Sequence, residues 1–283
     1  MEIHQDNLSD IDRYILKRQN IRLESKHRDF EMIMKRIAAF KDIHPNAEFL
    51  ELGIGTGWFL ILCKKKGISC KGIEISPQLV EFAHQFGRQN DVEPDIELGN
   101  IEEADIGRSR YDVIIASSTF EHVERWRTGL EKVYAALKPG GLFYFESSNK
   151  FSLKSAEYKF PLYGWLPNSW RYRLRIARQG EDIMKLGIDF NQFTYFKLRR
   201  FFKQLGYGSI YDRLQIFCLS NATNPSRKKK TVMKFINRIE PLRQLALLFA
   251  STTVFICLKP ASSTLSRSAA ENPGDPVDNT LAD

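Results

Sequence analysis

The stretch "FLELGIGTGWFLILCKKKG", residues 49–67, decides the fold of this chain. An apolar run that carries one carboxylate, Glu51, leads into glycines at every second position, namely Gly53, Gly55 and Gly57. The segment behind the glycines is amphipathic and basic, which is typical of a helix. A glycine-rich loop between a strand and a helix brings backbone N–H groups against a ligand. The stretch therefore predicts a strand, a ligand-binding loop and a helix.

The spacing of the glycines restricts the ligand. A dinucleotide-binding loop has the pattern G-x-G-x-x-G, because its third glycine lets the helix approach a pyrophosphate. Here the glycines are two residues apart, and Trp58 stands where that third glycine would lie. Glu51 before the loop suits an ammonium group and would repel phosphates. The loop therefore predicts a nucleoside ligand without phosphates.

Strand-like and helix-like segments alternate along the chain. Ser76-Pro77 predicts the start of one intervening helix, and Gly206 the end of another. Apolar runs predict strands at 48–53, 70–75, 94–99, 111–118, 142–148, 209–219 and 252–260. We therefore expect an α/β fold, with a Rossmann-like, doubly wound sheet of seven mostly parallel strands.

These patterns predict one domain with an insertion. Residues 1–44 are expected to form N-terminal helices, and residues 45–260 the sheet domain. An aromatic and basic segment at about 149–191 follows the fifth strand and lacks strand periodicity. The tail, 261–283, is rich in Ser, Asn, Pro and Asp and is expected to be disordered.

Polar residues at the ends of the next two strands predict further parts of the ligand. Glu74 closes the second strand, where an acid accepts hydrogen bonds from ribose hydroxyls. Gly99, Asn100 and Ile101 end the third strand, where an amide and an apolar side chain suit the edge and face of an adenine. Amino acid, ribose and adenine in this order describe S-adenosylmethionine.

The whole set of motifs resembles the class I S-adenosylmethionine-dependent methyltransferases, in their small-molecule or ubiquinone-pathway O-methyltransferase-like branch. The resemblance covers about residues 47–150 by motif and extends to about residue 260 by strand order. It is carried by the Glu51-x-Gly53-x-Gly55-x-Gly57 run, Glu74, Gly99-Asn100, "FEHV" (120–123) and "LKPGG" (137–141). The resemblance implies an enzyme that transfers a methyl group from S-adenosylmethionine.

The resemblance also implies roles for individual residues. Glu51 would meet the methionine ammonium through water, and Glu74 would bind the ribose diol. Asn100 would meet the adenine amino group, although many relatives have aspartate there. The cofactor-binding set implied in this way is Glu51, Gly53, Gly55, Gly57, Glu74, Ile75, Asn100, Ile101, Ser117 and Phe120.

His122 is the candidate catalytic residue, because it follows the fourth strand at the rim where the methyl group should lie. A base is needed only if the acceptor is a hydroxyl that must lose its proton. A structural histidine is an equally good interpretation. The segment also resembles the Glu-x-x-Glu-His metal site of ubiquinone-pathway and small-RNA methyltransferases. Ser118 replaces the first glutamate, and a hydroxyl is a poor substitute for a carboxylate ligand, so we expect no metal.

The segment 149–191 is the clue to the acceptor. Its aromatic and basic side chains suit a lid over an apolar substrate, with Asn149, Tyr163 and Trp165 as lid residues. They also suit contact with the headgroups and acyl chains of a membrane surface. We expect O-methylation of a small, lipid-like, phenolic or glycan acceptor. The alternatives are a nucleic-acid methyltransferase, for which no recognition module is found, and a non-catalytic cofactor-binding protein.

Charge and cysteine usage bear on location. The net charge is +8, and basic residues concentrate after residue 149 and in residues 226–238. This favours anionic partners, although a solvated surface explains the charge as well. The cysteines lack metal-ligand spacing, the chain starts without a signal peptide, and the apolar stretch 245–258 is too short to span a membrane. We therefore expect a cytoplasmic protein, peripheral at most to the inner face of a membrane.

Overall fold

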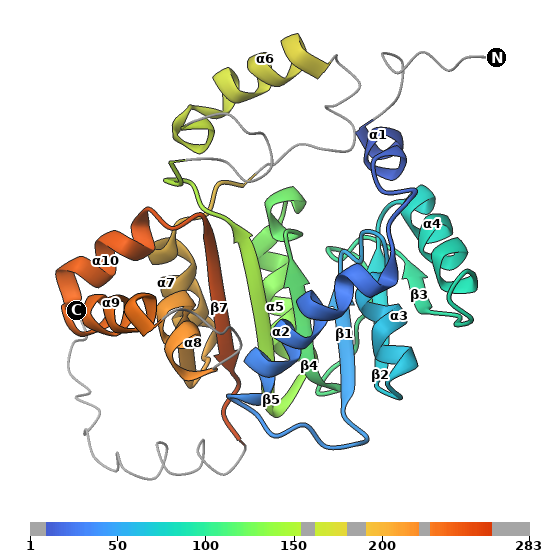
Figure 1. Cartoon of the computed structure of the whole chain (residues 1–283), viewed down its shortest axis with the longest axis horizontal. Helices are drawn as coiled ribbons and strands as arrows, with labels where there is room; N and C mark the ends of the chain where they lie inside the picture. The colour runs from blue at the N-terminus through green and yellow to red at the C-terminus, as the bar shows by residue number, and fades with distance from the viewer. Residues whose placement is uncertain (1–9, 154–161, 180–190, 221–226, 262–283) are drawn as a thin grey trace, which may run out of the picture.

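The computed structural model describes residues 10–153, 162–179, 191–220 and 227–261 (Figure 1). Its centre is a seven-stranded sheet with the order β3-β2-β1-β4-β5-β7-β6. β7 is antiparallel to both of its neighbours, and the other strands run parallel to one another. The strands are β1 Glu48–Leu52, β2 Ser69–Glu74, β3 Asp95–Leu98, β4 Tyr111–Ser117, β5 Leu137–Ser148, β6 Ser209–Asp212 and β7 Thr252–Leu258. The doubly wound, mostly parallel α/β fold expected from the sequence is confirmed.

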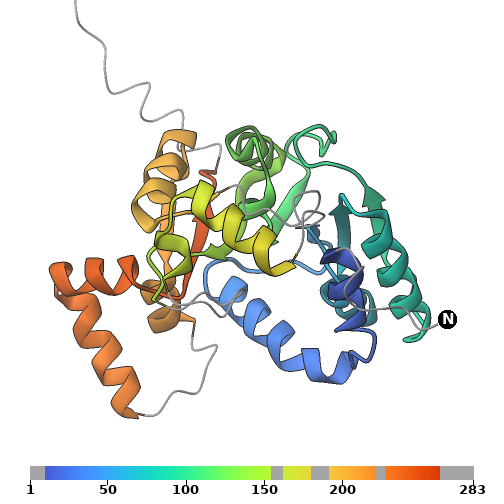
Figure 2. The same cartoon turned by 90° about the horizontal axis from the view of Figure 1, so that it is seen from above.

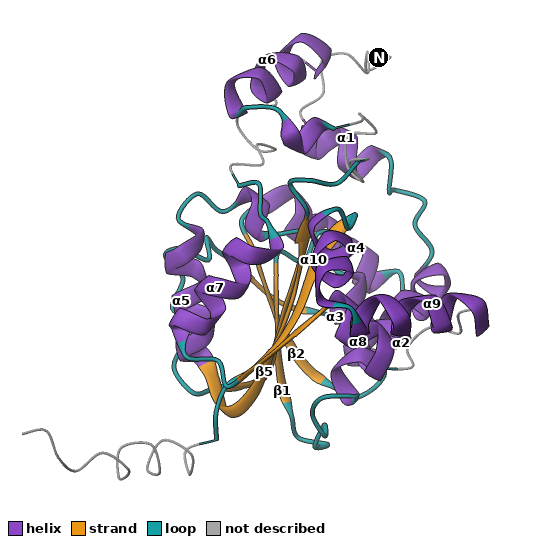
Figure 3. Cartoon of the chain, turned by 90° about the vertical axis from the view of Figure 1, so that its left-hand side faces the viewer, coloured by secondary structure: helices purple, strands orange, loops and turns teal. Residues whose placement is uncertain are grey.

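Helices cover both faces of the sheet, as the edge-on view in Figure 3 shows. α5 and α7 lie on one face, and α2, α3, α4 and α8 lie on the other. The bounds of these helices are α2 His27–Ala38, α3 Trp58–Lys65, α4 Pro77–Arg88, α5 Trp126–Ala136, α7 Tyr195–Leu205 and α8 Arg213–Leu219. The remaining helical elements are α1 Asp10–Leu16, η2 Leu23–Lys26, η3 Phe120–His122, η4 Tyr163–Trp165, α6 Asn168–Gln179, α9 Arg227–Arg238 and α10 Glu240–Leu248.

The two central strands explain why the sheet has two hydrophobic layers. Phe49 on β1 and Val113 on β4 are register partners and pack into the layer under α2 and α3. Leu50 and Ile114, one residue further on, pack into the layer under α5 and α7. All four side chains are buried, since successive residues of a strand point to opposite faces. This is why these strands read as continuous apolar runs rather than alternating ones.

The helix ends follow local chemistry. Ser76 is the N-cap of α4, where its hydroxyl accepts a hydrogen bond from the Leu79 N–H, and Pro77 is the first helical residue. Gly206 ends α7 with a left-handed φ of +93°, a conformation that glycine adopts without a steric penalty. Both ends agree with the sequence-based expectation.

The prediction of a strand at 209–219 is correct for its first part and wrong for the rest. β6 ends at Asp212, and α8 begins at the next residue. The reason is a capping box: the Asp212 carboxylate accepts from the N–H groups of Leu214 and Gln215, while the Gln215 side chain accepts from the Asp212 N–H. An apolar run of this length does not by itself distinguish a buried strand from a buried helix.

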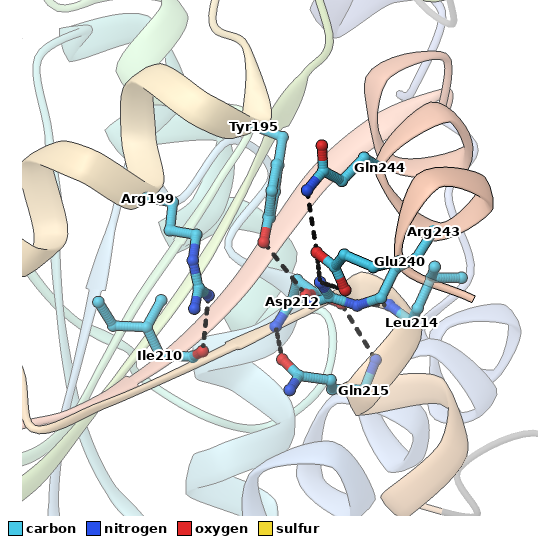
Figure 4. A network of polar contacts seen from close by, with 9 residues as sticks. All are labelled: Tyr195, Arg199, Ile210, Asp212, Leu214, Gln215, Glu240, Arg243 and Gln244. Atoms are coloured by element: carbon cyan, nitrogen blue, oxygen red, sulfur yellow. Dashed lines mark hydrogen bonds and ion pairs between the residues drawn. The ribbon is translucent and has the colours of Figure 1, made fainter. Parts of the chain in front are cut away.

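Asp212 also joins separate elements of this half of the molecule (Figure 4). Its fully buried carboxylate pairs with Arg243 of α10 and accepts a hydrogen bond from the Tyr195 hydroxyl of α7 at 3.4 Å. Arg243 is itself bound by Glu240 at the start of α10. The network fixes α10 against the end of the sheet.

Two further elements lie above the carboxyl ends of the parallel strands. Figures 1 and 3 show α1 and α6 there, beyond the end of the sheet. α9 and α10 lie at the opposite side of the molecule from β3, next to β7 and β6 (Figure 2). Among the described residues, none of the helices combines the length and the apolar character that crossing a bilayer requires. The expected disordered tail at 261–283 falls outside the described residues, apart from its first residue.

Candidate active site

The order of the strands reverses between β1 and β4, which are neighbours in the sheet. In open α/β sheets, ligands bind at this point, outside the carboxyl ends of the strands. The loop between β1 and α3 holds Gly53, Gly55 and Gly57, and all three have left-handed φ angles between +55° and +73°. The loop is therefore a built feature that side chains with a Cβ would strain.

Two of the glycines make room for other parts of the molecule. A Cβ on Gly53 would lie 2.5 Å from the hydroxyl oxygen of Thr119, which donates a 2.7 Å hydrogen bond to the Leu52 carbonyl. A Cβ on Gly55 would lie 3.0 Å from the hydroxyl oxygen of Tyr14 on α1. The loop is thus enclosed by the segment after β4 and by the N-terminal helix.

Gly57 also has a packing role. It is the N-cap of α3, and a Cβ there would lie 2.6 Å from the Cβ of Ala83 on α4. Its bare α-carbon therefore lets α3 and α4 pack closely. Helix packing is thus one reason for the third glycine.

Glu51 is buried at the centre of the site. Its Oε2 atom has no hydrogen-bond partner among the described residues. Burial raises the pKa of Glu51 well above its ordinary value, and repulsion from the Glu74 carboxylate adds to the rise. A buried carboxyl oxygen without a partner is costly, so this atom is a candidate to pair with a ligand.

Glu74, at the end of β2, is held by the backbone. Its Oε1 accepts hydrogen bonds from the N–H groups of Ile75 and Ser76, and its Oε2 accepts from the Gly55 N–H at 3.3 Å. Burial raises the pKa of Glu74, and these hydrogen bonds oppose the rise. An ionised carboxylate offers about four acceptor positions, so it keeps acceptor capacity toward the site.

The residues expected to contact the adenine differ in how accessible their side chains are. The Ile75 side chain is 62% exposed beside Glu74, which leaves its apolar face available to a ring. Asn100 is half-buried, and its side-chain oxygen accepts from the Glu102 N–H at 3.0 Å. Ile101 is buried in the core under α5, so its side chain is less available than expected.

The segment after β4 shows a similar division. Ser117 is exposed at the strand end, and Ser118 has a left-handed φ of +56°, which is strained for a residue with a side chain. Phe120 is fully buried and packs against Phe143 and Phe145 of β5. The Phe120 ring thus belongs to the core and does not face the glycine loop's solvent-exposed side.

His122 lies at the end of η3, partly exposed, and its backbone N–H donates to the Thr119 carbonyl. The preceding Glu121 is buried, and its carboxylate accepts hydrogen bonds from the Ser147 hydroxyl and the Ser148 N–H. Glu121 thus fastens η3 to the end of β5. Among the described residues, no group of three His, Cys, Asp or Glu side chains has the arrangement of a metal site.

Asn191, the last residue of the inserted segment, joins that segment to η3. Its backbone N–H donates to the Glu121 carbonyl, and its side-chain amide donates to the carbonyls of Phe120 and Val123 at 3.2 and 2.6 Å. The short helix η3, which carries His122, is therefore hydrogen-bonded to β5 through Glu121 and to the insertion through Asn191.

The three expected lid residues occupy different environments. The Asn149 amide donates to the carbonyls of Leu248 and Ala250 at the end of α10, so Asn149 is an anchor for that helix. Tyr163 is buried below α6. Trp165 is partly exposed and stacks on Phe249, 6.0 Å between ring centroids.

Within the aromatic and basic segment, residues 168–179 form α6, and its basic and aromatic side chains do not divide simply into exposed and buried ones. Arg171 is completely buried, with its guanidinium over the rings of Tyr163 and Tyr172 and a hydrogen bond to Asn168. Trp170 is instead mostly exposed. The side chains of Arg175 and Arg178 lie outside the described residues.

Comparison with known proteins identifies the family. The model of a methyltransferase domain family matches residues 25–208 of the chain. The chain belongs to this methyltransferase family. A structure of an S-adenosylmethionine-dependent methyltransferase from Archaeoglobus fulgidus has the same fold, with a TM-score of 0.51, 20% sequence identity, and coverage of 87% of this chain and 99% of that one.

Curated relatives match over shorter stretches. A malonyl-[acyl-carrier protein] O-methyltransferase of Priestia megaterium is 34% identical over 100 residues, which is 35% of either chain. A ubiquinone biosynthesis O-methyltransferase of Coxiella burnetii is 26% identical over 119 residues, 40% of this chain and 51% of that one. The chain thus spans about a third to a half of the length of these relatives.

The residues present fit S-adenosylmethionine, the cofactor of this methyltransferase. The unpartnered Glu51 oxygen suits the methionine ammonium, the fixed Glu74 carboxylate suits the ribose diol, and Ile75 suits a face of the adenine. Bound there, the cofactor supplies a methyl group on a sulfonium, which is already activated for displacement. The protein's task is to align an acceptor with it and exclude water.

Sequence reasoning missed two residues of the site. Thr119 closes the loop by binding the end of β1, and Tyr14 covers Gly55 from α1. Tyr14 also lies under the Arg18 guanidinium, 3.6 Å from its ring centroid. Neither residue belongs to a spaced motif, so only the spatial arrangement reveals them.

Proposed function

We propose that this S-adenosylmethionine-dependent methyltransferase methylates an oxygen atom of a small, lipid-like, phenolic or glycan acceptor. The acceptor would lie between η3 and the inserted segment at 149–191. The inserted segment would cover it as a lid. The position of His122 carries the proposal: it ends η3, which follows β4 at the same sheet edge as the glycine loop. The names of the curated O-methyltransferase relatives support transfer to oxygen.

His122 is the proposed general base. An alcohol or phenol loses its proton as it attacks the methyl group, and a positioned base contributes about 10²–10⁴-fold to such a step. A carboxylate acceptor, such as the malonyl group named for one relative, is already ionised at neutral pH and needs no base. The need for His122 therefore distinguishes hydroxyl acceptors from carboxylate acceptors.

The test compares His122→Gln with His84→Gln, a histidine on α4 beside Glu93 that lies outside the site. Transfer of labelled methyl groups is measured to catechols, sugar alcohols, a malonyl thioester and RNA. We expect His122→Gln to lower kcat for phenols by about a hundredfold with unchanged cofactor affinity, and His84→Gln to have no effect. Phenols with electron-withdrawing groups should lose less, because they ionise without help.

Three results would contradict the proposal. Transfer to RNA alone would assign the enzyme to nucleic-acid methylation. Transfer to a carboxylate at a rate that His122→Gln does not change would show that His122 is not needed as a general base. Cofactor binding without transfer to any acceptor in the panel would favour a binding protein.

A further inference from the structure

α9 and α10 expose apolar side chains that the methyl-transfer site does not use. Figure 2 shows both helices standing out from the molecule beside β7 and β6. Their inner faces pack on the core through Met233, Ile236 and Leu247. α10 is nevertheless apolar on its outer face too, and such a helix is normally covered.

The outer face of α10 consists of Leu242, Leu245 and Phe249, which are three and four residues apart and exposed. Leu245 alone is 52% exposed. Phe249 stacks on Trp165 of the inserted segment, and Phe151 contacts the edge of Trp165 at 5.3 Å between centroids. The apolar surface of α10 thus continues into the segment after β5.

The outer face of α9 has a mixed character. Phe235 is 58% exposed, and Val232 beside it is exposed as well. Lys228, Lys234 and Arg238 are exposed on the same side of the helix, since residues three and four apart are neighbours. α9 has no acidic residue, and the carboxylate nearest in sequence, Glu240, is bound by Arg243 and Gln244.

We propose that α9 and α10 dock this enzyme on an anionic membrane surface. Apolar side chains flanked by lysine and arginine suit the boundary between acyl chains and anionic headgroups. The charge pattern favours lipid over a second copy of the chain, whose α9 would present the same positive charges. Membrane contact was expected from the inserted segment, and Trp165 of that segment adjoins the surface of α10 through Phe249.

The surface is rigidly connected to the carboxyl edge of the sheet. Asn149, at the end of β5, binds the last carbonyls of α10, and Arg243 fixes α10 to the buried Asp212. Docking would therefore hold the edge that carries the site in a fixed orientation relative to the bilayer. Delivery of a lipid-like acceptor from the bilayer rests on the proposed function, but docking itself does not.

The test is co-sedimentation of the full chain with phosphatidylcholine vesicles, with and without phosphatidylserine, in the absence of cofactor and acceptor. Lys234→Glu/Arg238→Glu is compared with Lys64→Glu/Lys65→Glu on α3, which changes the net charge equally. We expect the α9 pair to weaken binding to anionic vesicles at least about tenfold and the α3 pair to weaken it far less. Equal effects of the two pairs would overturn the proposal.

The apolar part is tested with Leu245→Ser against Leu98→Ser, which replaces a leucine of β3 that is 54% exposed at the far edge of the sheet. Leu245→Ser should weaken vesicle binding about fivefold, and Leu98→Ser should leave it unchanged. Absent vesicle binding, or a dimer in light scattering that Leu245→Ser dissociates, would refute docking. Charge-dependent vesicle binding that ignores Leu245→Ser would refute insertion of the apolar face of α10. Because no methyl transfer is measured, these outcomes are independent of the acceptor assignment.

Discussion

The two halves of the sheet are held in different ways. The half with β1, β2 and β3 forms its site from backbone: left-handed glycines, N–H groups that bind Glu74, and gaps into which Thr119 and Tyr14 fit. The half with β6 and β7 depends on side chains, above all on the buried Asp212 network in Figure 4. Ligand binding is concentrated in the first half, and long-range connections in the second.

Substitutions in the two halves should therefore affect different properties of the protein. A substitution in the backbone-built half should remove ligand affinity while the fold persists. A substitution in the side-chain network should lower the free energy of unfolding while the remaining folded protein binds the cofactor normally.

Asp212→Ala should have the largest effect. It leaves Arg243 without its buried partner and removes the N-cap of α8, and breaking a buried ion pair costs about 3–5 kcal/mol. Urea unfolding should show this loss, whereas calorimetry below the transition should give an unchanged cofactor Kd. The control is Asp105→Ala, which removes an exposed turn-forming carboxylate bound to the Gly107 N–H. Equal losses in the two variants would mean that the network contributes little.

Gly53→Ala should have the next largest effect, and Gly67→Ala is its matched control. Their φ angles are +70° and +69°, so the backbone strain is equal. Only at Gly53 would the new methyl group meet Thr119, since nothing lies within 4 Å of it at Gly67. Both variants should lose about 1–2 kcal/mol of stability from strain. Gly53→Ala alone should weaken cofactor binding, by about a hundredfold, because Thr119 and the loop must shift. Similar cofactor Kd values for the two variants would show that Gly53 does not contribute to the cofactor site.

The same contrast explains what the sequence reveals. Backbone requirements leave glycines at fixed spacings, so the loop, Glu74 and the strand order could be predicted. Side-chain packing leaves only composition, and so Phe120 and Arg171 could not be placed: a ring or a guanidinium reads the same in sequence whether it faces a substrate or the core. α8 was missed because a single capping aspartate, Asp212, decides between strand and helix.

Glu51→Gln should weaken cofactor binding at neutral pH less than Gly53→Ala does, and its effect should be the most specific of the three. Burial, with repulsion from Glu74, raises the pKa of Glu51 in the ligand-free protein, and a bound ammonium group would lower it again. Binding then releases a proton. Cofactor affinity should therefore rise with pH, by at most about tenfold per pH unit, until the pH passes the raised pKa. In Glu51→Gln this slope should be absent, with an affinity about tenfold below that of the native protein at pH 7.5 and equal to it in acid. Glu48→Gln, on the same strand, should keep the native slope. Because the pKa of Glu51 is higher in the folded than in the unfolded protein, native stability falls as pH rises from the unfolded-state pKa toward the folded-state pKa. Ligand-free Glu51→Gln lacks this loss and should melt about 2–4 °C higher at pH 7.5. A stabilised variant with an unchanged pH slope would show that the buried carboxyl group is costly but does not meet the cofactor.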